Sequence, residues 1–209
     1  MNDKTTKKFL CIIDMQNDFL TGPLGSEHCR RAIPNVVKLL DSDKWFKVYL
    51  TLDTHDDKYA ETLEGRKLPV THCIEHTWGH KICKELADAV KKLSNEDEIP
   101  PDTDIYQTIF KYTFGSQELI WDIQNHIGKD DGKLFGEDVE IHMCGVCTSI
   151  CVLANAVLLR AQLPNAKIII HADACSDVDS QMHRHALACL QAQQCDIVYD
   201  EAAVAPECC

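Results

Sequence analysis

The sequence lacks several features that define whole classes of protein. No apolar stretch among its 209 residues reaches the length needed to cross a bilayer, so no membrane span is predicted. Basic residues are scarce, because 21 Lys and Arg stand against 33 Asp and Glu and give a formal net charge of -12. A nucleic acid or an anionic membrane would require a basic face, so neither partner is expected.

The first residues also lack the apolar core of a secretory signal peptide. Met1-Asn2-Asp3-Lys4 leads directly into a strand-like run, which predicts a cytoplasmic location. Cysteine is abundant, with 12 residues, but the spacings form no disulfide framework. In a reducing compartment most of these cysteines should therefore be small buried hydrophobes.

Repeats, linkers and low-complexity segments are absent too, which predicts a single domain over residues 1–209. Short apolar runs instead alternate with helical patterns. Several of these runs are continuously apolar, as in a parallel sheet that is covered on both faces. The chain is therefore predicted to be an α/β protein with a six-stranded, mostly parallel sheet and helices on both faces. The predicted strands are Phe9–Asp14, Phe46–Asp53, Ile105–Lys111, Val139–Cys144, Lys167–Ala172 and Cys195–Tyr199.

Helical periodicity fills the intervals between these strands. The clearest faces are formed by Ile82, Leu86, Val90 and Leu93, by Leu119, Ile120, Ile123 and Ile127, by the apolar run Val152–Leu159, and less strongly by Met182–Gln194. The stretch from Thr54 to Trp78 shows little periodicity. A loop of that length inside a compact domain is usually functional.

Four chemically reactive side chains lie at or just after predicted strand ends: Asp14, Asp53, Lys111 and Cys151. Ligands of open parallel sheets bind beyond the carboxyl ends of the strands, so these residues should converge. Cys151 also lies between a strand and an apolar helix, where the helix dipole favours the thiolate. Each residue alone has an ordinary structural explanation, but together they indicate an active site with a cysteine nucleophile.

Three segments resemble the signature segments of the isochorismatase-like cysteine hydrolases, in the same order and over most of the chain. They are Asp14-Met15-Gln16-Asn17-Asp18-Phe19, the segment around Lys111, and Gly145-Val146-Cys147-Thr148-Ser149-Ile150-Cys151-Val152. The resemblance implies a triad in which Asp14 is the general base, Lys111 stabilises charge and Cys151 is the nucleophile.

The same resemblance implies further details of the nucleophile turn. The peptide bond between Val146 and Cys147 would be cis, and the backbone N–H groups of Cys147 and Cys151 would form the oxyanion hole. Ser149 departs from the family pattern, because a carboxylate often occupies that position.

A second motif suggests a metal. Asp53 and His55 lie two residues apart after a strand, and His72 follows on the long loop, which is a donor set suited to a divalent ion with open positions. The pattern resembles the metal site of nicotinamidases. That resemblance implies one divalent metal, with zinc as the first choice and iron or manganese as alternatives.

Other residues compete for places in this metal site. Some nicotinamidases add a glutamate, for which Glu64 is the best counterpart and Glu61 the fallback. His76 and His80 are alternatives to His72.

The resemblance implies a small amide substrate, with nicotinamide as the first choice, and conversion to nicotinate and ammonia. Phe19, Leu68 and Tyr112 are the expected substrate contacts, with Trp78 and Phe114 as alternatives. Leu68 replaces the aromatic residue usual at its position. Hydrolysis of another small amide or of a vinyl ether stays open, as does assembly into a homo-oligomer.

Two other classes of function compete with a hydrolase. Cys144-Gly145-Val146-Cys147 is a C-x-x-C at a strand end, as in thiol-redox proteins, and together with Cys151 it could ligate a metal or a cluster. That interpretation leaves Asp53 and Lys111 without a role. A non-catalytic binding protein on the same fold is the third hypothesis, which the reactive set at the strand ends disfavours.

Overall fold

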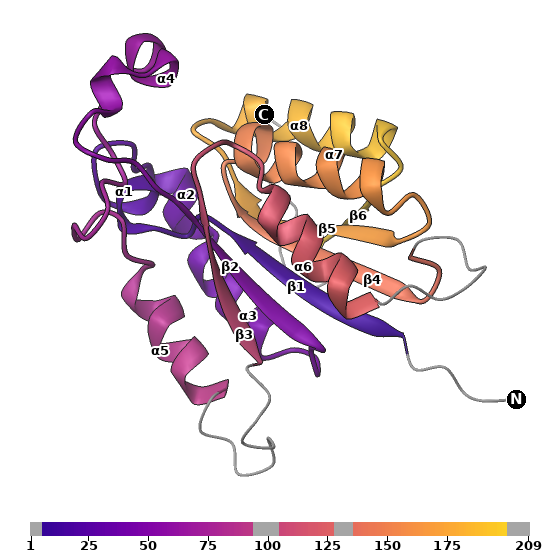
Figure 1. Ribbon diagram of the computed structural model, residues 1–209. Helices are drawn as coiled ribbons and strands as arrows, with labels where there is room; N and C mark the ends of the chain where they lie inside the picture. Colours follow the sequence, from indigo (N-terminus) through magenta and orange to yellow (C-terminus); the bar gives the residue numbers. More distant parts are fainter. Residues whose placement is uncertain (1–5, 94–104, 128–135, 200–209) are drawn as a thin grey trace, which may run out of the picture.

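The computed structural model describes residues 6–93, 105–127 and 136–199. Six strands form one sheet in the order β3-β2-β1-β4-β5-β6, and every neighbouring pair is parallel. Figure 1 shows this sheet twisting through the centre of the molecule. The predicted α/β fold is confirmed. The strands are β1 (Lys7–Ile13), β2 (Lys47–Asp53), β3 (Tyr106–Lys111), β4 (Val139–Val146), β5 (Lys167–Ser176) and β6 (Asp196–Val198).

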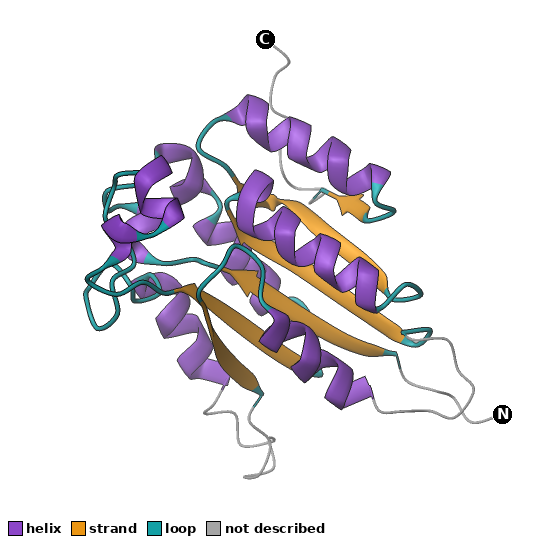
Figure 2. Ribbon diagram, turned by 45° about the horizontal axis from the view of Figure 1, so that its top comes forward, coloured by secondary structure: helices purple, strands orange, loops and turns teal. Residues whose placement is uncertain are grey.

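Helices cover both faces of the sheet. Figure 2 shows α6, α7 and α8 side by side over one face, with α3 and α5 behind the other. The helical elements are α1 (Asn17–Leu20), α2 (Glu27–Arg31), α3 (Ile33–Leu40), η1 (Tyr59–Glu61), α4 (Leu63–Lys67), α5 (Lys84–Leu93), α6 (Gln117–Ile127), η2 (Thr148–Val152), α7 (Leu153–Gln162) and α8 (Ser180–Ala192). Among the described residues, none of these helices has the length and apolar character to cross a bilayer.

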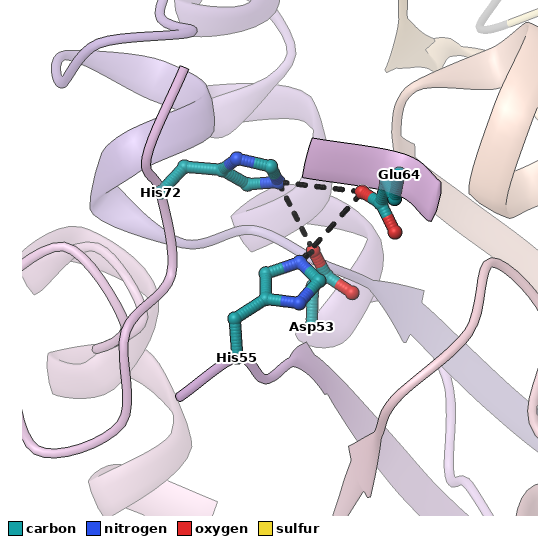
Figure 3. A group of neighbouring side chains, drawn as sticks. All are labelled: Asp53, His55, Glu64 and His72. Carbon is teal, nitrogen blue, oxygen red and sulfur yellow. Dashed lines mark hydrogen bonds and ion pairs between the residues drawn. The ribbon is translucent and has the colours of Figure 1, made fainter. Parts of the chain in front are cut away.

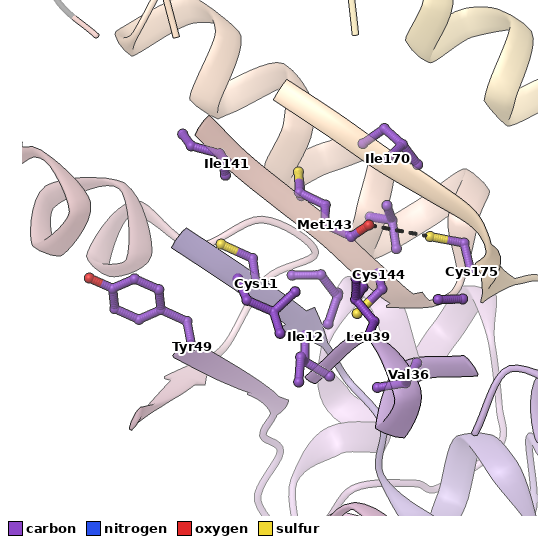
Figure 4. Close-up of a cluster of buried hydrophobic side chains, with 14 of the residues drawn as sticks. Cys11, Ile12, Val36, Leu39, Tyr49, Ile141, Met143, Cys144, Ile170 and Cys175 are labelled. Atoms are coloured by element: carbon purple, nitrogen blue, oxygen red, sulfur yellow. Dashed lines mark hydrogen bonds between the residues drawn. The ribbon is translucent and has the colours of Figure 1, made fainter. Parts of the chain in front are cut away.

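The double covering explains why the central strands are apolar without alternation. Residues Phe9 to Ile13 of β1 are each at most 1 % exposed, so both faces of the strand lie in the core. Figure 4 shows part of this core, where Val36 of α3 lies near Ile12 and Cys144 of the sheet. Cys144 is fully buried and acts as a small hydrophobic residue here.

Two strands run further than the sequence pattern indicates. The predicted ends of β4 and β5 at Cys144 and Ala172 are too early, because pairing continues to Val146 and Ser176 after a register shift beyond Met143. Gly145 lies in this irregular part with φ 116°, and a Cβ there would come within 2.0 Å of the Ile13 carbonyl oxygen. Only glycine fits, and the extension brings β4 directly to the nucleophile turn.

Several short helices carry too little periodicity to be predicted. They include α1, α2 and α3 between the first two strands, and η1 and α4 within the stretch from Thr54 to Trp78. The sequence does contain a signal for the start of α3, which is the proline in its first turn. A proline is tolerated there because the N–H that it lacks would have no partner within the helix.

The chain order along the sheet reverses at its centre. β1 pairs with β2 on one side and with β4 on the other, which opens a crevice beyond the carboxyl ends of these strands. The predicted site residues follow the ends of β1, β2, β3 and β4, and the fold therefore brings them to one edge.

Candidate active site and metal centre

The three residues of the expected triad meet around one buried ammonium group. Lys111 Nζ lies 2.7 Å from Asp14 Oδ2 and 3.4 Å from Cys151 Sγ. The exposed fractions are 2 % for Lys111, 0 % for Asp14 and 6 % for Cys151. A carboxylate, an ammonium and a thiol are thus held together almost out of contact with solvent.

The end of β1 aims Asp14 into this group. Asp14 adopts a left-handed conformation with φ 50°, and its N–H donates to the Thr51 carbonyl oxygen at 3.2 Å. The Thr51 hydroxyl donates to Asp14 Oδ1 at 2.6 Å, which leaves Oδ2 for Lys111. Thr51 therefore fixes the orientation of the carboxylate.

The nucleophile turn is held from both sides. Asn155 Nδ2 donates to the Cys151 carbonyl oxygen at 2.8 Å, and the Ser149 N–H donates to Asp177 Oδ2 at 2.6 Å. Asp177 is 1 % exposed, so a buried carboxylate reaches this turn from the end of β5, although position 149 itself carries a serine. The peptide bond between Val146 and Cys147 is cis, as the family resemblance implies.

Helical structure begins earlier than the apolar run indicates. η2, a turn of π-helix, starts at Thr148 and places Cys151 in the first helical turn ahead of α7. The expectation that this position favours the thiolate is wrong for the resting protein. Burial and the negative charge of Asp14 raise the pKa of Cys151 well above its ordinary value, and they outweigh the opposing charge of Lys111.

Burial also affects the pKa values of Asp14 and Lys111. Burial raises the pKa of Asp14, an effect that the attraction of Lys111 only partly offsets. Burial opposes the charge on Lys111, yet the surrounding Asp14, Cys151 and Asp53 raise its pKa well above the usual range. The resting site therefore contains a permanent cation beside an acid and a thiol that compete for protons.

A second polar group adjoins the first. Figure 3 shows Asp53, His55, Glu64 and His72 pointing toward a common centre, with one ligand atom from each within 4.8 Å of the others. Asp53 Oδ2 lies 3.0 Å from His55 Nε2 and 3.4 Å from His72 Nε2. Glu64 Oε1 lies 3.7 Å and 3.8 Å from the same two nitrogens.

These separations suit a small divalent cation. Bonds of about 2.0–2.1 Å in a tetrahedral site would place neighbouring donor atoms roughly 3.3 Å apart. The Val70 carbonyl oxygen lies 2.8 Å from Nδ1 of His72, an arrangement that orients the other ring nitrogen of metal-binding histidines. Two imidazoles and two carboxylates are a donor set that zinc, iron and manganese all accept. The residues present therefore fit a metal.

Asp53 connects the two groups, because its oxygens face different partners. Oδ2 belongs to the histidine cluster, and Oδ1 lies 3.1 Å from Lys111 Nζ. Burial acts against its charge, but hydrogen bonds with His55 and His72 and the charge of Lys111 hold the pKa of Asp53 below its ordinary range. The carboxylate is therefore ionised and available to both groups.

The structure distinguishes among the competing ligands that the sequence left open. Glu64 lies in the group, whereas Glu61 is exposed on η1. His76 has 89 % of its side chain exposed. The His80 ring lies 2.9 Å from the Thr54 hydroxyl and stacks on Phe110. These contacts lie outside the group of four candidate ligands.

Of the expected substrate contacts, some lie beside the site and others lie in solvent. The Phe19 ring lies 5.4 Å from the His72 ring, edge to face, so it borders the metal group. Leu68 is 37 % exposed and Tyr112 is 70 % exposed, so neither is enclosed in the site. Their alternatives Trp78 and Phe114 are also largely exposed, at 60 % and 48 %.

Gln16 and Tyr59, which the sequence pattern does not predict, support these two groups. Gln16 is fully buried, donates to the carbonyl oxygens of Asp53 and His80, both at 2.9 Å, and accepts the Asp53 N–H at 2.8 Å. Tyr59 contacts both imidazoles, with ring centroids 4.6 Å from His55 and 5.0 Å from His72. Gln16 lies inside the motif that begins at Asp14, which was the available signal.

The C-x-x-C cysteines have separate surroundings. Cys144 lies in the core, where burial raises its pKa, and the nearby Cys175 and Cys11 add to the effect. Cys147 is partly exposed, and the nearby Cys29 thiol together with burial raises its pKa. The ten described cysteines are all free thiols. Cys208 and Cys209 lie outside the described residues.

Known proteins resemble this chain in sequence and fold. Residues 8–96 match the family model of the isochorismatase domain. An uncharacterised isochorismatase family protein, PncA of Bacillus subtilis, is 28% identical over 191 residues, which are 87% of this chain and 93% of the relative. A nicotinamidase of Saccharomyces cerevisiae is 26% identical over 186 residues, which cover 72% of this chain and 80% of the relative.

The fold also matches solved structures. The pyrazinamidase of Pyrococcus horikoshii in complex with zinc superposes with a TM-score of 0.66 at 19% identity, over 93% of this chain and 99% of that one. Its fold is shared by the described sheet and helices, and the matching family model covers the strands that carry Asp14 and Asp53. Residues 8–96 thus match the isochorismatase domain, and the chain is similar in fold to a protein solved with zinc and in sequence to an isochorismatase family protein and a nicotinamidase.

Proposed function

We propose that this protein is a metal-dependent cysteine amidohydrolase that converts nicotinamide to nicotinate and ammonia. One observation carries the proposal: Lys111 Nζ lies within 3.4 Å of Asp14, Asp53 and Cys151, which joins a thiol–carboxylate pair to a group of metal-ligand type. The similarity to a yeast nicotinamidase supports the choice of substrate.

The acylation step follows from the contacts of the triad. Asp14 takes the thiol proton of Cys151, since burial raises the pKa of its carboxyl group and so makes the carboxylate a stronger base. The sulfur attacks the carboxamide carbon, and the carbonyl oxygen becomes an oxyanion. The N–H groups of Cys147 and Cys151 are the proposed donors to that oxyanion.

The same groups complete the reaction. Asp14 returns its proton to the amide nitrogen, ammonia leaves, and a thioester of Cys151 remains. Asp14 then accepts a proton from water as the water attacks the thioester carbon, which releases nicotinate and restores the thiol. Lys111 stays protonated throughout and balances the negative charge on Asp14 or on the sulfur.

Asp53, His55, Glu64 and His72 are the proposed metal ligands. A bound divalent ion would supply a Lewis-acidic point for the pyridine nitrogen, with zinc as first choice and iron or manganese as alternatives. Phe19 would pack against the pyridine ring. Leu68 and Tyr112 remain proposed contacts at the exposed margin, where closure of the long loop over a substrate would be needed to engage them.

The competing substrates are another small amide and a vinyl ether. They differ from nicotinamide in what they offer the metal group, because a ring nitrogen is needed for coordination and a carboxamide for ammonia release. Benzamide is therefore the decisive comparison, since it keeps the carboxamide and the ring shape but has no ring nitrogen.

The test is ammonia release from nicotinamide, pyrazinamide and benzamide by the metal-loaded protein. We expect turnover of the first two, little turnover of benzamide, and complete loss in Cys151→Ala. Equal rates for nicotinamide and benzamide would contradict the ring–metal contact. No ammonia from any amide, with reduction of a protein disulfide instead, would favour the thiol-redox alternative. Such an enzyme would serve pyridine-nucleotide salvage, for which a cytoplasmic location is expected.

A further inference from the structure

One residue of the metal group lies on a loop and not on a regular element. Asp53 ends β2, His55 follows it closely, and Glu64 lies on α4. His72 comes from the separate segment between α4 and α5, as Figure 3 shows. The position of its ring therefore depends on contacts that hold this loop.

The turn after His72 has an unusual backbone conformation. Cys73 is fully buried and left-handed, with φ 48°. A residue other than glycine keeps such a conformation only where its surroundings enforce it. The Cys73 carbonyl oxygen accepts the His55 N–H at 3.0 Å, and the Cys73 N–H donates to Asp18 Oδ2 at 2.8 Å. The turn is therefore tied on one side to the other histidine and on the other side to Asp18.

Asp18 connects two separate points of the same loop. Its carboxylate accepts the Cys73 N–H, and its own N–H donates to the Gly79 carbonyl oxygen at 3.1 Å. Asp18 is 8 % exposed, so water competes little for these bonds. The loop between residues 73 and 79 is thus closed across one buried aspartate.

Two glycines leave space for this carboxylate. A Cβ on Gly79 would lie 2.0 Å from Asp18 Oδ2, and its three nearest neighbours would all be atoms of the Asp18 carboxylate. A Cβ on Gly22 would lie 2.3 Å from Asp18 Oδ1. The carboxylate therefore fills the space that side chains at these two positions would occupy, and its orientation is fixed.

We infer that Asp18 is a positioning residue for the metal centre, which holds the turn after His72 so that the imidazole is aimed at the other three ligands. Asp18 is not one of the four residues whose ligand atoms converge, so it acts through the loop. The consequence for nicotinamide hydrolysis rests on the proposed function, whereas the effect on metal affinity does not.

A different explanation is that Asp18 attracts a cation only by its negative charge. Two substitutions distinguish these explanations. Asparagine keeps an acceptor oxygen for the Cys73 N–H but removes the charge, whereas alanine removes both. If Asp18 acts by position, asparagine should preserve most of the metal affinity and alanine should not.

The main experiment measures zinc affinity. Full-length protein is stripped of metal and titrated with zinc in competition with a chromophoric chelator, and His72→Ala defines the binding at other sites. We expect Asp18→Ala to bind zinc on the order of 10-fold more weakly, as when a group that supports a metal ligand is removed. Asp57→Asn is the control, because it removes an exposed charge two residues after His55 and should bind as the wild type does. Equal losses in Asp18→Asn and Asp18→Ala would overturn the inference.

Hydrogen exchange of the metal-free protein gives a readout that needs neither zinc nor turnover. Peptides covering residues 72–79 should exchange slowly in the wild type and faster in Asp18→Ala, while peptides from β1 and β4 should stay unchanged. Unchanged exchange in the loop would contradict a positioning role. Equal acceleration in the core strands would show a general loss of stability instead.

Gly79→Ala tests the same contact from the side of the loop. Its Cβ would clash with the Asp18 carboxylate, so this substitution should weaken zinc binding in the wild-type background. In Asp18→Ala the clash is absent, and Gly79→Ala should add little. Fully additive losses would overturn the inference. If Asp18→Ala does not fold, the zinc affinity of Gly79→Ala decides, and wild-type affinity in that variant would refute the role of Asp18.

Ammonia release separates this inference from the proposed function. Asp18→Ala should raise the KM for nicotinamide more than it lowers kcat, because the metal group is the proposed site of the pyridine nitrogen and the triad is unchanged. A lower kcat at unchanged KM would contradict action through the metal centre. A wild-type protein that binds zinc but releases no ammonia would count against the proposed function alone, and the zinc affinities would still decide the role of Asp18.

Discussion

Replacing Lys111 with methionine should damage stability and activity for one electrostatic reason. The side chain is 2 % exposed, and its ammonium lies 2.7 Å from Asp14 and 3.1 Å from Asp53. Methionine has a similar length but no charge, so the variant leaves Asp14 buried without its cation. Removing one partner of a buried ion pair costs about 3–5 kcal/mol.

The expected effects can be measured separately. For a chain of this size, each kcal/mol lowers the melting temperature by about 2–4 °C, so Lys111→Met should melt roughly 6–20 °C lower. Ammonia release should fall on the order of 10²-fold or more, as when one preorganised electrostatic group is removed from an active site. Lys44→Met is the matched control, because Lys44 is exposed and its loss should change stability by less than about 0.5 kcal/mol.

A second substitution tests whether the unpaired carboxylate of Asp14 causes the loss of stability. If the cost comes from an unpaired carboxylate, Asp14→Asn in the Lys111→Met background should recover stability, with a coupling of about 1–3 kcal/mol in a double-mutant cycle. Activity should stay lost, since both the base and the cation are gone. A Lys111→Met protein as stable as the wild type, or further destabilisation by Asp14→Asn, would refute the argument.

Three further outcomes are expected. His72→Ala should lose the metal in elemental analysis and most ammonia release but keep its circular dichroism spectrum, and unchanged nicotinamide turnover without metal would contradict the pyridine contact. Gly145→Ala should cost on the order of 3 kcal/mol or more in urea unfolding, because the new Cβ would clash with the backbone of Ile13. Gly115→Ala should cost less, because its Cβ would clash only with the end of the Leu158 side chain and would meet backbone at ordinary contact distance. Burial and His142 lower the pKa of His171 to about 4. Between pH 4 and the ordinary pKa of 6.5, His171 is therefore protonated in the unfolded chain but neutral in the folded chain. Stability should therefore fall by about 2 kcal/mol from about pH 7.5 to about pH 5, and His171→Gln should flatten this acid limb; an equal slope in both proteins would show that another group is responsible.

The sheet could be predicted because its central strands are buried on both faces. Continuous apolar runs such as Phe9 to Ile13 carry that information locally, and parallel pairing then follows from the intervening helices. The same hydrophobic pattern does not predict where the strands end. The extension of β4 to Val146 depends on a glycine with positive φ and on pairing with β5, and neither is visible in one strand's hydrophobicity.

The short helices were unpredictable for a different reason. α1 and α2 have four and five residues, too few for a periodic face. Their stability comes from packing onto the rest of the protein, which propensity does not report.

The position of a residue was easier to predict than its protonation. A helix start does favour a thiolate, but that expectation considers one element, whereas the pKa of Cys151 depends on everything around it. Full burial and the nearby Asp14 outweigh the helix and Lys111, so the resting thiol keeps its proton. The proposed chemistry is consistent with this state, because a protonated thiol needs a base, and Asp14 is placed to act as one.

Asp53 explains why the two halves of the site are not independent. One of its oxygens belongs to the group around His72, and the other lies 3.1 Å from Lys111. A cation bound in the histidine group would attract part of the negative charge of the Asp53 carboxylate and weaken its ion pair with Lys111. The Lys111 ammonium would then interact more strongly with Asp14 and Cys151. Metal loading should then change the chemistry of the thiol as well as the position of the substrate. In this arrangement Asp53, at the end of β2, would do more than hold a metal, because it also sets the charge balance around the thiol of Cys151.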